Sequence, residues 1–88
     1  NNVYISFDID GLTPGLCPNT GTPVPGGLEF REIDYLLYLL AVSNRKIIGF
    51  DLCEVAPGGE GEWDANVGAR VLYKMCIYTH LNNQKQIL

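Results

Sequence analysis

The sequence predicts an α/β fold built on a mainly parallel sheet, and two observations carry that prediction. Residues 3–7 and 46–55 are short runs rich in apolar, β-branched and aromatic side chains, as in buried strands. Each run is followed by a stretch with helical periodicity, over residues 29–42 and 64–79. Strand, helix, strand, helix in this order implies a right-handed crossover between parallel strands, so we expect helices layered on a sheet.

Length and composition limit the class of protein. The chain has 88 residues, enough for one small domain, and its 47% apolar and 18% charged residues indicate a globular interior rather than a disordered chain. The net charge is -4, and the six lysines and arginines form no stripe that could follow a phosphate backbone. We therefore expect no nucleic-acid partner.

The cysteines and the apolar runs predict a cytoplasmic protein without a membrane span. Cys17, Cys53 and Cys76 are odd in number and widely spaced, which is unlike a disulfide framework or a zinc site and favours a reducing compartment. The longest apolar run, residues 35–42, is far shorter than the roughly 20 residues that cross a bilayer. The chain also enters its first strand almost at once, so we expect it to be cut from a larger domain.

The first strand leads into a long loop. Residues 3–7 show no alternation of polar side chains, which predicts a strand covered on both faces. Residues 11–27 hold four of the five prolines and five of the ten glycines, so they predict an ordered loop rather than a regular element. Loops of this length are commonly functional.

The two predicted helices each carry an apolar stripe that should face the sheet. In residues 29–42 the stripe consists of Ile33, Leu36, Leu37 and Leu40. A break over residues 57–61 precedes the last helix, in which Asp64 is the expected N-cap. The stripe of that helix consists of Val67, Val71, Leu72 and Met75. We expect the helix to end near Thr79 and the polar tail after His80 to fray.

Two carboxylates follow the first strand, and they are the main candidates for chemistry. In a regular strand, Asp8 and Asp10 would share one face, with Cα atoms roughly 6.5 Å apart. They stand at the carboxyl end of a parallel strand, where α/β sheets collect ligands, and Gly11 lets the backbone turn away. Carboxylate oxygens suit hard divalent ions such as Mn²⁺ and Mg²⁺, so we interpret the pair as metal ligands. Capping or ion-paired carboxylates are the alternative.

The segments around these carboxylates resemble a known family. Residues 6–12 read Ser-Phe-Asp-Ile-Asp-Gly-Leu, residues 21–27 read Gly-Thr-Pro-Val-Pro-Gly-Gly, and residues 49–57 read Gly-Phe-Asp-Leu-Cys-Glu-Val-Ala-Pro. Together they resemble the ureohydrolase family of arginases and agmatinases, in matching order from Asn2 to about Cys76. The resemblance implies that residues 1–88 are the carboxy-terminal part of a single ureohydrolase domain, an arginase-like three-layer α/β sandwich.

The resemblance also implies an activity. The family hydrolyses guanidino C–N bonds with a hydroxide that bridges two Mn²⁺ ions in each subunit, so the chain would be part of a manganese-dependent enzyme. Among small-molecule guanidino substrates we favour agmatine, cleaved to putrescine and urea, with arginase or formiminoglutamase activity as the alternative. A homo-oligomer, either a trimer or a hexamer, is implied as well.

The resemblance assigns roles to particular residues. Asp8 would bridge both metal ions, Asp10 would bind one of them, and Glu54 would hold the substrate's guanidinium through a bidentate pair. Thr22 would support Glu54 or face the substrate, and a turn-stabilising threonine is the alternative. For Glu54 the alternative is an ion pair with a nearby Lys or Arg. Asp51 has the opposite strand parity to Glu54, so we interpret it as structural or as a support for the residues that form the site.

Departures from the family pattern leave rival interpretations open. Thr13 stands where the family commonly has Asp, and the histidine and aspartate motifs that supply the family's other metal ligands are absent, so this chain would hold about half a site. A haloacid-dehalogenase-type phosphatase is one rival, because residues 7–11 also resemble its motif with Asp8 as nucleophile, although Leu12 replaces the usual Thr. A non-catalytic interaction domain of the same fold is the other.

Overall fold

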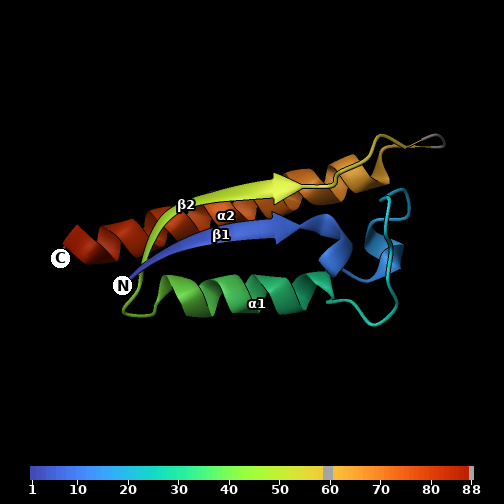
Figure 1. Cartoon of the computed structure of the whole chain (residues 1–88). Coiled ribbons are helices and arrows are strands. Elements are labelled where there is room, and N and C mark those ends of the chain that lie inside the picture. Colours follow the sequence, from blue (N-terminus) through green and yellow to red (C-terminus); the bar gives the residue numbers. More distant parts are fainter. Residues whose placement is uncertain (59–60, 88) are drawn as a thin grey trace.

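The described part of the chain forms two strands and two helices in the predicted order (Figure 1). The structure, a computed structural model, describes residues 1–58 and 61–87. Its elements are β1 (Asn2–Asp8), η1 (Ile9–Gly11), η2 (Pro14–Leu16), α1 (Phe30–Ala41), β2 (Lys46–Cys53) and α2 (Trp63–Ile87), where η marks a short 3-10 turn. The prediction of a strand-helix-strand-helix chain is confirmed.

The two strands pair in parallel, as a crossover connection requires. The register runs from Asn2 opposite Lys46 to Asp8 opposite Cys53. Because both strands run the same way, their carboxyl ends meet at one edge of the sheet, beside the loops and the start of α2 (Figure 1). Asp8 and Cys53 are therefore neighbours across the sheet at that edge.

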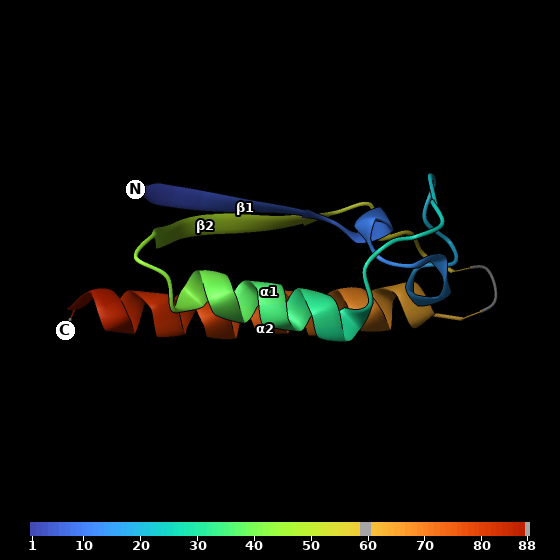
Figure 2. The ribbon, with the colours of Figure 1, turned by 90° about the horizontal axis from the view of Figure 1, so that it is seen from below.

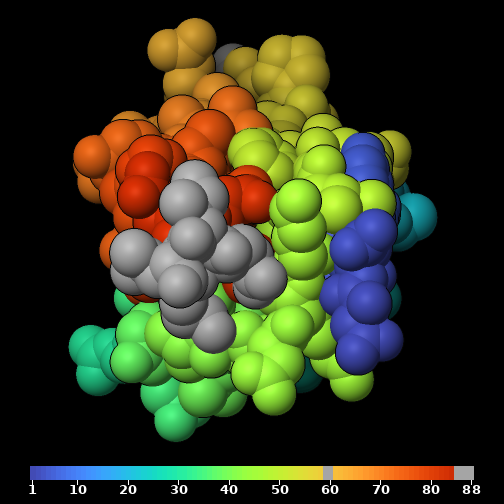
Figure 3. All heavy atoms as spheres, turned by 90° about the vertical axis from the view of Figure 1, so that its left-hand side faces the viewer, coloured from blue at the N-terminus to red at the C-terminus, as the bar shows by residue number. Residues whose placement is uncertain are grey.

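Both helices cover the same face of the sheet (Figure 2). Seen from the end that holds the N-terminus, β1 and β2 form one side of the molecule and the helices form the other (Figure 3). Within residues 1–58 and 61–87 nothing covers the opposite face, where Tyr4 is 55% and Ile48 is 58% exposed. The described residues therefore make two layers, and they cover one of the two faces of β1 that the sequence predicts to be covered in the whole domain.

The core lies between the helices and the sheet. Its helical members are Ile33, Leu37 and Ala41 of α1 and Val67, Val71 and Met75 of α2. Leu36 and Leu72, which the periodicity also placed on the buried stripes, are 55% and 43% exposed. A sheet of two strands is narrow, so one row of side chains from each helix reaches it and the adjacent row faces outward.

The loop between β1 and α1 is closed at its base. Leu12 and Leu28 form a short parallel bridge, in which the Thr13 N–H donates to the Leu28 carbonyl and the Leu28 N–H donates to the Gly11 carbonyl, both at 2.9 Å. Gly27 is required at this crossing, because a Cβ there would lie 2.4 Å from the carbonyl group of Leu12. The two ends of the loop are thus held together.

The start of α2 differs from its prediction. The helix begins at Trp63, which puts Asp64 in the first turn rather than at the N-cap. The Asp64 carboxylate is fully buried and accepts hydrogen bonds from Asn19 in the long loop. Of the predicted break over residues 57–61, residues 59 and 60 lie outside the described part of the chain.

The end of α2 also differs, since the helix continues well past Thr79 and includes the tail that was expected to fray. Buried Asn82 accounts for the extension. Its side-chain oxygen accepts from the Ile47 N–H at 2.8 Å, and its amide nitrogen donates to the Ala41 and Arg45 carbonyls at 3.0 and 2.8 Å. These bonds hold the tail against the turn between α1 and β2. None of the described helices is long and apolar enough to cross a membrane.

A polar contact joins the two helices. The Tyr78 hydroxyl of α2 donates to the Asp34 carboxylate of α1 at 2.7 Å, and the Lys74 ammonium lies 3.2 Å from the same carboxylate. The hydrogen bond from Tyr78, with Lys74 beside it, lowers the pKa of Asp34. The contact favours the ionised carboxylate in the folded protein.

Candidate functional site

The candidate site lies where both strands end. Asp8 is the last residue of β1 and pairs with Cys53, the last residue of β2, and Glu54 follows at once. The long loop and the start of α2 reach the same end of the molecule (Figure 1). The topology therefore brings Asp8, Asp10, Thr22 and Glu54 to one edge of the sheet.

A turn, and not strand periodicity, places the two aspartates beside each other. The chain leaves β1 at Asp8 and enters η1, where the Asp10 N–H donates to the Asp8 carboxylate at 3.1 Å. Ile9 between them is fully buried, which anchors the turn. The expectation that both residues belong to one regular strand is wrong, because the backbone bends directly after Asp8.

The paired carboxylates create a site of negative charge. Partial desolvation, together with the neighbouring Asp10 carboxylate, raises the pKa of Asp8 above its ordinary value. A cation bound to both groups would relieve that repulsion, and oxygen ligands of this kind suit Mn²⁺ or Mg²⁺. The donor set therefore fits a hard divalent ion.

The Thr22 hydroxyl contacts an aspartate rather than Glu54, whose support was one of the two roles expected for it. This hydroxyl donates to the Asp10 carboxylate, whereas its predicted support of Glu54 is not what the structure shows. The hydroxyl that does contact Glu54 belongs to Thr20, which donates to the Glu54 backbone carbonyl at 3.2 Å. The long loop thus contacts both acidic parts of the site.

Glu54 leaves the strand in an unusual backbone conformation. Its φ is 68°, in the left-handed region of backbone conformation that residues other than glycine and asparagine rarely adopt. The side chain itself is exposed at the sheet edge. Sequence reasoning could not detect the left-handed backbone at Glu54, because nothing in Cys53-Glu54-Val55 marks it.

Asp51 has a structural role, in line with its interpretation from strand parity. It accepts hydrogen bonds from the Ser6 hydroxyl at 3.0 Å and the Cys53 thiol at 3.4 Å. The bond from Ser6 is the main cause of the lowered pKa of Asp51. Its carboxylate is therefore occupied by neighbours on the uncovered face of the sheet.

The described residues bring together no complete set of metal ligands. Within residues 1–58 and 61–87 no three His, Cys, Asp or Glu side chains are grouped as they would be to hold an ion. His80 lies well along α2, a helix that begins at the site and runs away from it (Figure 1). Asp8 and Asp10 are thus the acidic pair that this part of the chain contributes.

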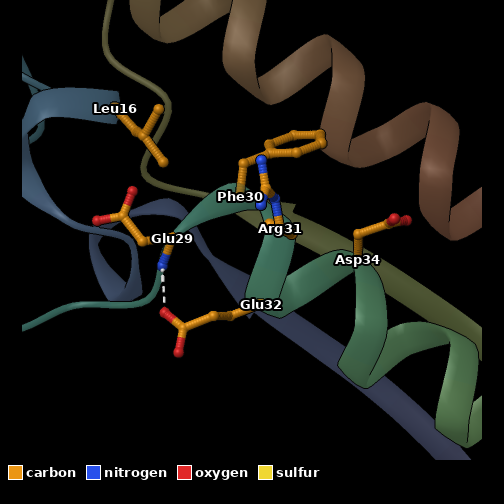
Figure 4. A pocket seen from close by; sticks show the side chains of 6 residues that line it. All are labelled: Leu16, Glu29, Phe30, Arg31, Glu32 and Asp34. Atoms are coloured by element: carbon orange, nitrogen blue, oxygen red, sulfur yellow. Dashed lines mark hydrogen bonds between the residues drawn. The ribbon is translucent and has the colours of Figure 1, made fainter.

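A separate open pocket lies at the first turn of α1 (Figure 4). It is lined by Leu16, Glu29, Phe30, Arg31, Glu32 and Asp34. Two of its acidic groups have structural partners, since the Glu29 N–H donates to Glu32 at 2.8 Å in a capping box and Asp34 binds Tyr78. None of the predicted site residues lines it, so we do not assign it to the chemistry.

Comparison with known proteins identifies the family. The model of the Arginase family matches residues 1–77. Proclavaminate amidinohydrolase of Streptomyces clavuligerus is 43% identical over 77 residues, 82% of this chain and 24% of that protein. The hepatic arginase of Aquarana catesbeiana is 41% identical over 81 residues, 91% of this chain and 22% of that protein. The chain belongs to the arginase family, as the resemblance predicted.

Solved structures show the same fold. Agmatine ureohydrolase of Thermoplasma volcanium matches with a TM-score of 0.79 and 30% identity, over 96% of this chain and 28% of that one. Proclavaminate amidinohydrolase of Streptomyces clavuligerus matches with a TM-score of 0.79 and 35% identity, over 93% and 27%. The predicted α/β arginase fold is confirmed. The chain spans about a quarter of the length of these relatives.

Proposed function

We propose that the complete protein is a manganese-dependent hydrolase of guanidino compounds, and that this chain supplies an acidic pair and a substrate-binding glutamate. The observation that carries the proposal is the meeting of Asp8, Asp10 and Glu54 at one sheet edge in a member of the arginase family. That family membership leaves the phosphatase alternative without support.

Asp8 and Asp10 would hold the metal. Their adjacent carboxylates neutralise positive charge, and the Thr22 hydroxyl orients Asp10 by donating to it. When bound, a pair of such ions would lower the pKa of a water molecule enough to make it nucleophilic near neutral pH. Manganese is preferred over magnesium on the family resemblance, since carboxylate oxygens accept either.

Glu54 would bind the substrate. A guanidinium is planar and carries parallel N–H donors, which a carboxylate accepts in bidentate fashion. The exposed position of the Glu54 side chain beside the Asp8 end of β1 leaves it available for such a pair. Glu54 then orients the substrate and moves no proton.

Agmatine is the substrate that we propose first, with putrescine and urea as products. Relatives named agmatinase occur in Halalkalibacterium halodurans and Chromobacterium violaceum, at 45% and 47% identity. Arginase activity is the second candidate, because the hepatic arginase matches over more of this chain. A cytoplasmic location and assembly into a trimer or hexamer remain predictions.

Metal content and turnover of the complete protein test the proposal. Asp8→Ala and Asp10→Ala should each lower bound manganese and nearly abolish urea release from agmatine, because each removes a direct ligand. Asp51→Asn is the matched control, since its carboxylate binds Ser6 and Cys53. Normal manganese content and normal rates in both alanine variants would refute the ligand assignment. Turnover of arginine but not agmatine would favour the second candidate.

A further inference from the structure

The backbone of Glu54 needs support. Among residues 1–58 and 61–87 it is the one residue other than glycine with a positive φ, at 68°. A glutamate gains nothing locally from this conformation, so surrounding contacts must hold it. The direction in which the Glu54 side chain leaves the strand depends on those contacts.

Thr20 makes the contact that holds this backbone. Its hydroxyl donates to the Glu54 carbonyl at 3.2 Å, and the residue is only 5% exposed. Its own N–H donates to the Cys17 carbonyl at 3.2 Å, which fixes the loop on the other side. Burial excludes the water that would otherwise compete for the Glu54 carbonyl.

A second buried contact fixes the residue before Thr20. The Asp64 carboxylate, fully buried in the first turn of α2, accepts from the Asn19 N–H at 3.1 Å and from the Asn19 amide at 3.0 Å. Because the neighbouring residue is tied to α2, Thr20 cannot shift without breaking these bonds. A continuous series of contacts therefore leads from α2 through Asn19 and Thr20 to Glu54.

We propose that Thr20 is a positioning residue for Glu54, and that Asn19 and Asp64 keep it in place. The hydroxyl of Thr20 stabilises the left-handed Glu54 backbone and thereby aims the carboxylate at the guanidinium of the substrate. This inference rests on the proposed function, in which Glu54 binds that guanidinium. Thr20 itself touches neither metal nor substrate.

A double-mutant cycle in the complete protein distinguishes positioning from simple stabilisation of the loop. Thr20→Val removes the hydroxyl at nearly constant volume, and we expect kcat/KM for the guanidino substrate to fall roughly 10-fold with manganese content retained. Thr20→Ser should restore most of the activity. In a Glu54→Gln background, Thr20→Val should lower kcat/KM little further, because the carboxylate that Thr20 positions is already absent.

The outcomes separate the two proposals. Wild-type kinetics in Glu54→Gln alone would overturn the proposed function. A large effect of Glu54→Gln, combined with no effect of Thr20→Val or with effects that simply multiply in the double variant, would overturn the positioning role alone. If Thr20→Val does not fold, Asn19→Ala takes its place in the same cycle, because it loosens the residue that precedes Thr20.

Discussion

At the scale of single residues, the charge of Glu54 can be tested apart from its position. Glu54→Gln in the complete protein keeps the shape of the side chain but cannot form a charged bidentate pair. A hydrogen bond to a charged group contributes about 1.5–3 kcal/mol, so we expect kcat/KM to fall roughly 10- to 100-fold while manganese stays bound. Steady-state kinetics and metal analysis provide the measurement.

Glu62→Gln is the control for that variant, since Glu62 is an exposed glutamate of the segment that follows β2. It should behave as wild type. Loss of manganese in Glu54→Gln would contradict a purely substrate-binding role, because it would mean that Glu54 helps to hold the ions.

Part of the site was predictable from its residues and part was not. Asp8 and Asp10 were found because an acidic pair after an apolar run is visible in the sequence. Their contact through a 3-10 turn was not predictable. The buried Ile9 anchors that turn, but an isoleucine at this position would fit a continuing strand equally well. The role of Thr20 depends on a bond to a residue 34 positions away, which no local pattern encodes.

At the scale of elements, Asn82 ties the end of α2 to β2 and to the α1–β2 turn. Asn82→Leu would remove the buried hydrogen bonds to the Ile47 N–H and to the Ala41 carbonyl, and a buried polar group that loses its partner costs about 1–3 kcal/mol. We expect the complete protein to unfold at a clearly lower urea concentration. Gln84→Leu, an exposed change on the same helix, should leave the midpoint near its original value; equal midpoints in both variants would show that Asn82 is dispensable.

The contact between α1 and α2 predicts a dependence on pH. The pKa of Asp34 is lowered mainly by the hydrogen bond from Tyr78, so the ionised carboxylate favours the folded state. That contribution is present above the ordinary pKa of an aspartate and is lost as the pH falls through the lowered value. Tyr78→Phe should therefore lose stability at neutral pH but much less at a pH below the lowered pKa of Asp34, as measured by thermal unfolding at a series of decreasing pH values. An equal loss at both pH values would argue that packing, and not charge, is responsible.

The positions of the strands and helices were predictable where a local sequence pattern determines them. Apolar runs located both strands and helical periodicity located both helices, because each pattern is set by neighbouring residues in the sequence. The length of α2 was missed, since its polar last turns are held by tertiary bonds from Asn82. The exposure of Leu36 was missed too, because helical periodicity defines a face but not the width of the sheet that it meets.

At the scale of the whole molecule, the apolar surface predicts how the isolated chain behaves. Tyr35 and Tyr73 on the helices are 62% and 66% exposed, and Tyr4 and Ile48 are exposed on the uncovered face of the sheet. The outer edges of β1 and β2 have no partner strand among the described residues. We expect residues 1–88 expressed alone to aggregate or to remain molten, and to release no urea from agmatine even with excess manganese.

Calorimetry and a urea assay on that isolated chain give the test. A broad or missing thermal transition is the expected result. A sharp, cooperative transition accompanied by turnover would show that the remaining three quarters of a relative's length are not needed to complete the fold or the site. Complementation by the rest of the protein, added as a separate chain, should restore both properties if the two parts can assemble.

The bridge between Leu12 and Leu28 affects how the loop between these residues can diverge in evolution. The segment between them starts and finishes at the same place, with Gly27 fitted against the Leu12 carbonyl. Its tip, around Val24, is exposed and can gain or lose residues without moving the start of α1. The length of that tip can therefore diverge among relatives while α1 and the bridge at the base of the loop keep their places.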